Sequence, residues 1–349
     1  MVRRRQVIKL GAAAGVFGEA LSRWAIAETN RLFEISLAQF SLHRTYYGEH
    51  IKKGWVHLSQ LLREDPAAAV AGGPDPADFA MLARTEFDIG AVEYVNQFYF
   101  AQLGNEAYFK EMARKADDHG VVSHLMMLDG TGRLGAIDAG ERGDAMEKVK
   151  AWMGMAQLLG CAMVRVNIEG EGEPEERAKR TSESLDTLGE IGVGMGLAVV
   201  VENHGGLTSN GAWLAKVLSL AKHPGVGSLP DFGNFRIGKD AEGKDIWYDR
   251  YRGVSQLMPF AKAVSAKSYD FDSAGDERMT DFTQMLRIVL DAGYRGYIGI
   301  EYEGRQLNEF DGIRATQRLL QRVRAAYSSN SHSRSGFVER ADTAFALDE

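Results

Sequence analysis

Eight short apolar runs, separated by amphipathic stretches, constrain the fold of this chain more than any other feature of its sequence. The stretches between the runs place apolar residues at helical spacing, and several end in glycine, as helices commonly do. A strand followed by a helix, repeated roughly every 35 residues, predicts parallel βαβ units. The eight runs are residues 33–40, 87–95, 121–128, 161–168, 197–203, 226–232, 262–269 and 297–302.

The number of runs predicts how the sheet is arranged. Eight βαβ repeats within 349 residues favour a (β/α)8 barrel of the α/β class. Periodicity alone leaves an open doubly wound sheet as the alternative. No linker or shift in composition divides residues 28–327, so we expect a single domain there. Residues 328–349 are polar without sustained periodicity, and we expect a flexible tail.

The first 27 residues differ from the rest of the chain. Three consecutive arginines, Arg3 to Arg5, precede an apolar stretch rich in alanine and glycine that ends in Ala25-Ile26-Ala27. This segment resembles a twin-arginine export signal with an A-x-A cleavage site, which predicts a periplasmic or otherwise exported protein. The alternative is a basic amphipathic helix of the mature domain. No other stretch has the roughly 18 uncharged apolar residues of a spanning helix, so we expect no membrane span in the mature protein.

Charge and cysteine content bear on the partners of the protein. The formal net charge is −7, and removal of residues 1–27, which hold five basic residues and one acidic residue, brings it to −11. An acidic surface disfavours nucleic acid as a partner. The single cysteine, Cys161, lies in an apolar run, so we expect it in the core and in no internal disulfide. Homo-oligomerisation is left open.

Three acids stand at the ends of apolar runs: Glu202, Asp231 and Glu301. A carboxylate directly after a buried strand lies at the strand's C-terminal end, where parallel α/β proteins carry their functional groups. Three acids at equivalent strand ends would converge on one barrel mouth and could hold a hard divalent metal ion. The alternative for each acid is a solvated loop residue or a helix N-cap.

Four motifs, in order along the chain, resemble one family of barrels. ENHGG at 202–206, DFGNF at 231–235, VSAKSYDF at 264–271 and IGIEYEG at 298–304 are similar to strand ends of the xylose isomerase-like, sugar phosphate isomerase/epimerase family. The resemblance implies that Glu202, Asp231 and Glu301 bind a divalent ion (Mn, Mg, Co or Zn) and that the two glutamates act as acid and base. Many members have a histidine as fourth ligand where this chain has Ser265, so water, substrate or another side chain would take that position.

Other polar residues near the predicted mouth are candidates for catalysis or for substrate binding. His204 would bind a substrate hydroxyl or complete the metal shell, with hydrogen bonding inside its loop as the alternative. Lys267 would stabilise an oxyanion or pair with a carboxylate of the mouth. The candidates to contact substrate, each of which also has a structural explanation, are His43, Glu93, His124, Arg165, Asn167, Asn234, Trp247 and Tyr248.

These observations predict a metal-dependent sugar isomerase or epimerase with a small-molecule substrate. One glutamate would remove a proton beside a carbonyl and the other would return it, by way of an enediolate. Export favours a free sugar or sugar derivative over a sugar phosphate. Two alternatives remain. The first, found among barrels similar to this one, is a lyase or hydratase that cleaves 3-keto-glycosides by β-elimination, and the second is a non-catalytic periplasmic sugar-binding protein.

Overall fold

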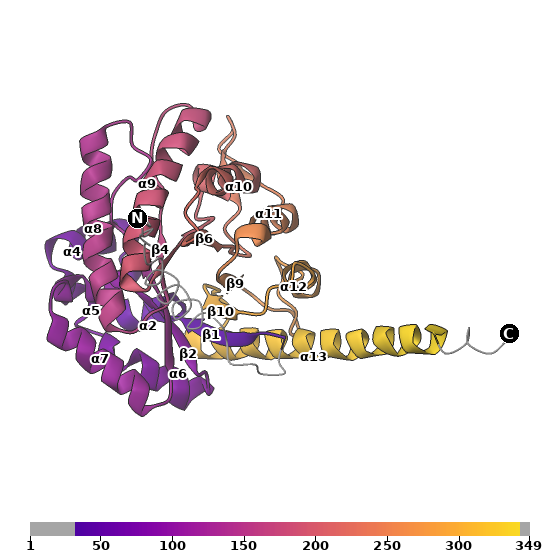
Figure 1. Cartoon of the computed structure of the whole chain (residues 1–349). Helices are drawn as coiled ribbons and strands as arrows, with labels where there is room; N and C mark the ends of the chain where they lie inside the picture. The colour runs from indigo at the N-terminus through magenta and orange to yellow at the C-terminus, as the bar shows by residue number, and fades with distance from the viewer. Residues whose placement is uncertain (1–31, 343–349) are drawn as a thin grey trace, which may run out of the picture.

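The structure is a computed structural model that describes residues 32–342, and it is a parallel barrel with helices around it (Figure 1). Each of the eight predicted runs contains one barrel strand, and neighbouring strands pair in parallel, so the predicted (β/α)8 fold is confirmed. The strands are β1 (Glu34–Ala38), β2 (Ala91–Val95), β3 (Val122–Leu128), β4 (Met163–Val166), β5 (Ala198–Glu202), β6 (Val226–Leu229), β9 (Val264–Ser268) and β10 (Tyr297–Tyr302).

The seam of the barrel lies next to one of the predicted acids. The strands follow one another in the order β6-β5-β4-β3-β2-β1-β10-β9. The two end strands, β6 and β9, are joined by isolated parallel bridges, Ser228 to Ala261 and Asp231 to Ser265, where the other neighbours have continuous ladders. Ser265 N also donates a 3.0 Å hydrogen bond to Pro230 O. The seam thus brings Asp231 beside Ser265.

Helices cover the outside of the barrel, and α12 shows how the sequence forms them. Asp281 caps its N-terminus by accepting hydrogen bonds from the N–H groups of Thr283 and Gln284. Apolar residues at helical spacing, Met285, Leu286 and Val289 among them, then pack into the core. The helices are α2 (His43–Tyr47), α3 (Glu49–Lys52), α4 (Trp55–Glu64), α5 (Pro66–Val70), α6 (Phe79–Phe87), α7 (Glu106–Asp118), α8 (Ala139–Leu158), α9 (Pro174–Met195), α10 (Gly211–Leu220), α11 (Arg250–Leu257), α12 (Phe282–Asp291) and α13 (Glu309–Asp342), with 3-10 turns η1 (Gln39–Leu42), η2 (Pro76–Asp78), η3 (Asn96–Gln102), η4 (Gly206–Ser209) and η5 (Met258–Phe260).

Two segments differ from the simple strand and helix repeat. The connection between β6 and α11 contains an antiparallel hairpin of β7 (Arg236–Lys239) and β8 (Asp245–Trp247). Helix α13 continues past residue 327, where the sequence predicted no regular structure, and its end projects away from the barrel (Figure 1). Extending a helix needs no new nucleation step, so a helix packed at its start can continue through polar sequence. The flexibility of residues 328–349 stays a prediction.

The predicted export signal, residues 1–27, lies outside the described residues and also stays a prediction. Among the helices of residues 32–342, none combines the length and the apolar character that crossing a membrane requires. Cys161 is buried, as expected for a residue of the core.

Candidate active site

The three predicted acids meet at the C-terminal end of the barrel. Glu202 is the last residue of β5, Glu301 lies near the end of β10, and Asp231 follows β6 after one intervening residue. One carboxylate oxygen of each lies within 4.8 Å of the other two, and all three side chains are buried. Parallel strands end on the same face of a barrel, which brings together residues far apart in the sequence.

Asn234 helps to orient two of the acids. Asp231 Oδ1 accepts hydrogen bonds from the backbone N–H groups of Gly233 at 2.8 Å and Asn234 at 2.7 Å. The Asn234 side chain donates to Glu202 Oε1 at 3.0 Å and accepts from Lys267 Nζ at 3.2 Å. The structure therefore places Asn234, a predicted substrate contact, among the groups that hold the acids.

Ser265 and Lys267 of β9 contact the acids from the neighbouring strand. Ser265 Oγ lies 2.7 Å from Asp231 Oδ2 and 3.1 Å from Glu301 Oε2, so its hydroxyl lies between two carboxylates. Lys267 Nζ lies 2.8 Å from Glu303 Oε1 and 3.5 Å from Glu301 Oε2. Lys267 is thus ion paired, and it is still next to an acid of the predicted site.

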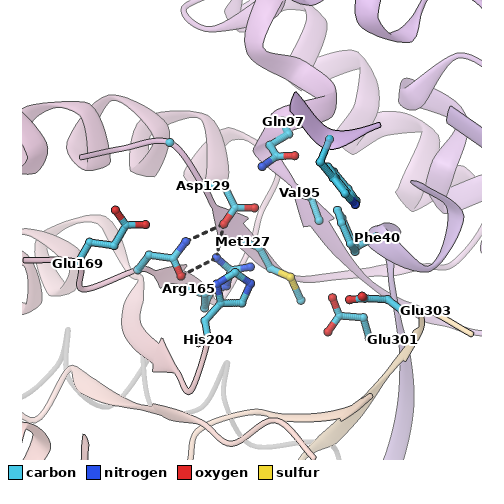
Figure 2. Close-up of a pocket in the computed structure, with 13 residues that line it drawn as sticks. Phe40, Val95, Gln97, Met127, Asp129, Arg165, Glu169, His204, Glu301 and Glu303 are labelled. Atoms are coloured by element: carbon cyan, nitrogen blue, oxygen red, sulfur yellow. Dashed lines mark hydrogen bonds and ion pairs between the residues drawn. The ribbon is translucent and has the colours of Figure 1, made fainter. Parts of the chain in front are cut away.

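A second buried cation, Arg165 of β4, lies beside Glu202. Its Nη1 donates to Asp129 Oδ1 at 2.7 Å, and Asn167 Nδ2 donates to the same oxygen at 2.8 Å (Figure 2). Arg165 Nε is 2.9 Å from Glu202 Oε2 but is not aligned for a hydrogen bond with it, and neither atom has another hydrogen-bond partner. Arg165 therefore compensates two negative charges while one Glu202 oxygen accepts no hydrogen bond.

Burial and the nearby cations together set the ionisation of the site. Burial raises the pKa of Asp231 to about 6, against the opposing charge of Lys267. Burial also raises the pKa of Glu301 well above its usual range, although Lys267 opposes this shift too. Burial disfavours a charged lysine, but the negative charges of Glu301 and Glu303 prevail and raise the pKa of Lys267. The cluster thus keeps its lysine charged, favours the protonated form of Glu301 and makes Asp231 titrate closer to neutral pH than an ordinary aspartate does.

The three acids, with Ser265, fit a divalent metal ion. Glu202 Oε2 is buried and pairs with Arg165 Nε at 2.9 Å without accepting a hydrogen bond, so its lone pairs are not all used by the protein itself. The surrounding donors are carboxylate and hydroxyl oxygens, which hard cations prefer. A divalent ion bound by Glu202, Asp231 and Glu301 would supply the charge that polarises a carbonyl or hydroxyl oxygen of a substrate.

A pocket of about 320 Å³ opens beside Glu301. Figure 2 shows Asp129, Arg165 and His204 on one side of this pocket and Glu301 with Glu303 on the other. The lining is partly polar and partly apolar, as expected for a small-molecule site. It consists of Phe40, Trp55, Val95, Gln97, Met127, Asp129, Gly130, Arg165, Asn167, Glu169, His204, Glu301 and Glu303.

Aromatic rings form one part of the pocket. The rings of Phe40 and His43 stack with centroids 4.8 Å apart and planes 13° apart, and Trp55 stacks on Phe40 at 6.0 Å. Trp55 is 48% exposed, although it lies at the start of a helix that packs on the barrel. Phe40 and Trp55 therefore present an aromatic surface on which the apolar face of a ring can pack.

Six of the eight candidate substrate contacts lie outside the pocket lining, among them His124, Glu93 and Trp247. His124 lies near the start of β3 and packs on Tyr297, the first residue of β10, with ring centroids 4.5 Å apart. Glu93 is buried inside the barrel, where Ser36 Oγ donates to its Oε1 at 2.6 Å. Trp247 is 48% exposed on the hairpin strand β8. A polar residue in an apolar run identifies a side chain directed inward but does not give its height in the barrel.

The sequence interpretation missed other residues of the pocket. Asp129 directly follows β3, so the rule that found Glu202 would have found it as a fourth acid at a strand end. Glu303 stands two residues after Glu301, and side chains at that spacing in extended chain lie on the same side. Phe40 and Trp55 lie in the helical connections after β1, where the sequence carried no signal of a site.

Comparison with known proteins identifies the family. The sequence pattern of the xylose isomerase-like TIM barrel family matches residues 79–323, which is more than half of the chain. The protein belongs to this family. The strand-end motifs and the barrel therefore agree with the resemblance on which the sequence interpretation relied.

Individual known proteins match this chain over only part of its length or at low sequence identity. The α subunit of 3′-dehydrocarminate deglycosidase from a Microbacterium species is 35% identical over 92 residues, which is 25% of this chain and 26% of that protein. The chain thus matches only about a quarter of the length of this curated relative. Two solved structures share the fold: Escherichia coli 3-keto-D-glucoside 4-epimerase (TM-score 0.55, 13% identity, 71% of this chain and 94% of that one) and the IolI protein with a zinc atom (0.59, 13%, 84% and 99%).

Proposed function

We propose that this protein is an enzyme that removes a proton from a carbon beside a carbonyl group of a non-phosphorylated sugar or sugar derivative. One observation carries the proposal: Glu202, Asp231 and Glu301 bring carboxylate oxygens within 4.8 Å of one another at the end of the barrel that has the pocket. A cluster of buried carboxylates can both transfer protons and hold a divalent ion.

Glu202 and Glu301 are the proposed base and acid. They belong to different strands, β5 and β10, and we assign them to opposite faces of the reacting carbon. The raised pKa of Glu301 suits a group that delivers a proton. Proton removal by Glu202 leaves an enediolate, whose negative charge the Lys267 ammonium group would stabilise. Return of the proton to the same carbon gives an epimer, and return to the neighbouring carbon gives an isomer.

The charges of the pocket support a substrate without phosphate. Four acids line the pocket: Asp129, Glu169, Glu301 and Glu303. Arg165, the arginine of the lining, already contacts two carboxylates, so the described lining has no unpaired arginine or lysine for a phosphate. Hydroxyl groups can donate hydrogen bonds to the acids, whereas a phosphate dianion would be repelled by them.

The partial relation to a deglycosidase α subunit supports a second candidate, a lyase that acts on 3-keto-glycosides. Such an enzyme begins with the same proton abstraction beside the carbonyl. The electron pair left on carbon then expels the group on the next carbon and forms a double bond. The aromatic surface of Phe40 and Trp55 supports this candidate, because it offers an expelled group an apolar place to pack.

Proton exchange with D2O tests the shared first step. The purified protein is incubated in D2O with Mn²⁺ and a panel of free sugars and 3-keto-glycosides, and deuterium beside the carbonyl is followed by NMR. We expect exchange with the wild type and a loss of about 10²- to 10⁴-fold in Glu202→Gln and Glu301→Gln. Glu147→Gln, a change on an exposed surface helix, is the control and should exchange normally.

The products separate the candidates. A new stereoisomer or ketose identifies an epimerase or isomerase, and a released aglycone identifies the lyase. Sugar binding without exchange on any member of the panel would contradict the proposal and would favour a non-catalytic sugar-binding protein.

A further inference from the structure

Residue 265 sets this site apart, because a serine stands where many related barrels are expected to have a histidine ligand. We infer that Ser265 Oγ is the fourth protein donor of the metal site and makes it a site of oxygen atoms only. Such a site lacks the donors that favour Zn²⁺, so its preference shifts toward hard cations such as Mn²⁺ and Mg²⁺. The inference rests on the proposed function and adds to it the class of metal ion that the enzyme would use.

The position of the hydroxyl supports this assignment. Ser265 Oγ lies 2.7 Å from Asp231 Oδ2 and 3.1 Å from Glu301 Oε2, in the midst of the carboxylate cluster. A serine hydroxyl has one proton and two lone pairs, so it can donate to only one of these oxygens. A lone pair stays available for a cation while the proton is given to a carboxylate.

The atoms around Ser265 also have coordination capacity that the protein does not use. Asp231 Oδ1 is engaged by two backbone N–H groups, which leaves Oδ2 directed to the serine. Glu202 Oε1 is engaged by Asn234, whereas the buried Oε2 accepts no hydrogen bond. The open atoms of β5, β9 and the end of β6 are all oxygens, and Glu202 Oε2, which pairs with Arg165 Nε at 2.9 Å but accepts no hydrogen bond, keeps lone pairs for a further ligand.

The donor set determines which ions the site favours. The cluster of potential ligands in the described part of the chain contains neither histidine nor cysteine. Carboxylates and hydroxyls suit Mg²⁺ and Mn²⁺, and a serine or threonine hydroxyl binds Mg²⁺ in phosphate-binding loops. Imidazole and thiolate favour Zn²⁺. Because Zn²⁺ generally binds more tightly than Mn²⁺ to any given site, the informative quantity is the ratio of the two affinities.

Substitution of residue 265 tests the inference without any measurement of turnover. The full chain is stripped with a chelator and titrated calorimetrically with Mn²⁺ and, in competition with a chelator, with Zn²⁺. Ser265→Cys is nearly isosteric and replaces an oxygen by a thiol. We expect it to raise the preference for Zn²⁺ over Mn²⁺ at least about tenfold. We expect Ser265→Ala to weaken Mn²⁺ binding about three- to tenfold with little change in the ratio.

Cobalt adds a spectroscopic readout of the same contact. Co²⁺ bound to Ser265→Cys should show a thiolate-to-cobalt charge-transfer band that the wild type lacks, although the wild type also contains the buried Cys161. Circular dichroism and denaturant unfolding check that each variant folds. If Ser265→Cys does not fold, the Ser265→Ala titration decides, because unchanged Mn²⁺ affinity there would overturn the inference.

Four results would overturn it: no Mn²⁺ binding by the wild type at millimolar concentration, unchanged Mn²⁺ affinity in Ser265→Ala, an unchanged ratio in a folded Ser265→Cys, or Co²⁺ binding to that variant without the band. These results differ from failure of the proposed function. Deuterium exchange by a wild type that binds no Mn²⁺ would leave the proposed function standing and refute the metal inference. The expected metal selectivity without exchange on any sugar would refute the proposed function and leave the metal inference standing.

Discussion

The mouth and the interior of this barrel differ in whether their buried ionisable side chains have partners of opposite charge. At the mouth, Arg165 contacts Asp129 and Glu202, and Lys267 contacts Glu301 and Glu303. Inside the barrel, neither Glu93 nor His124 forms an ion pair with another described residue, and Glu93 Oε2 and His124 Nε2 have no hydrogen-bond partner there. Arg165 and Lys267 at the mouth thus have partners of opposite charge. Glu93 and His124 in the interior have none among the described residues and tend to lose their charge.

The pKa shifts show the consequence. Burial raises the pKa of Glu93 to about 7 and lowers the pKa of His124 to about 4, so each favours its neutral form. At the mouth, burial is outweighed by the charge of Arg165 together with His204 and the hydrogen bonds from Arg165 and Asn167, and the pKa of Asp129 is lowered. Asp129 and Lys267 thus keep their charges at the mouth, whereas Glu93 and His124 are biased toward their neutral forms inside the barrel, and this contrast makes predictions about stability.

The largest effect should follow from removal of a mouth cation. Lys267→Met leaves the buried Glu301 and the half-buried Glu303 without their common partner, and breaking a buried pair in this way costs about 3–5 kcal/mol of unfolding free energy. Denaturant unfolding at neutral pH measures the loss. Lys110→Met breaks an exposed pair with Glu106 and should change little. Equal losses in the two variants would mean that the mouth pairs are no stronger than surface pairs.

The difference between mouth and interior also explains what the sequence could predict. The strands were predictable because fully buried parallel strands read as continuous apolar runs, and Glu202 was predictable because it ends such a run. The pairing of Arg165 with Glu202 was not, because it depends on which side chains of neighbouring strands turn toward each other. The height of His124 in the barrel was not predictable for a related reason: the pairing of β2 with β3 skips this residue, so the alternation of inward and outward side chains breaks there.

Glu93 gives the second prediction. Its pKa is about 7 in the folded protein against 4.5 for the ordinary group, so folding retains a proton that the unfolded chain loses between these values. Stability from this group is present below pH 4.5 and is lost as the pH rises to 7, by up to about 3 kcal/mol. Glu93→Gln keeps the hydrogen bond from Ser36 and removes the titration. Between pH 4.5 and 7, the unfolding free energy of Glu93→Gln should therefore rise by that amount relative to that of the wild type.

A matched variant checks that the effect comes from confinement of the carboxyl group. A Cβ atom at Gly299 would lie 2.4 Å from Glu93 Oε1, so this glycine provides the space that the side chain occupies. Gly299→Ala should destabilise the wild type more than it destabilises a Glu93→Ala background. Parallel pH curves for the wild type and Glu93→Gln would show instead that Glu93 is ionised in the folded protein at neutral pH.

His124 should show the opposite sign and a smaller effect over the accessible range. Its pKa of about 4 lies below the ordinary 6.5, so the unfolded chain binds the proton first as the pH falls. Stability from this group is present above pH 6.5 and is lost as the pH falls toward 4. Between pH 6.5 and 5 the loss is about 2 kcal/mol. His124→Gln should be less sensitive to pH by that amount in denaturant unfolding. Equal pH sensitivity of the wild type and His124→Gln would show instead that the imidazole contacts water or a partner in the folded protein.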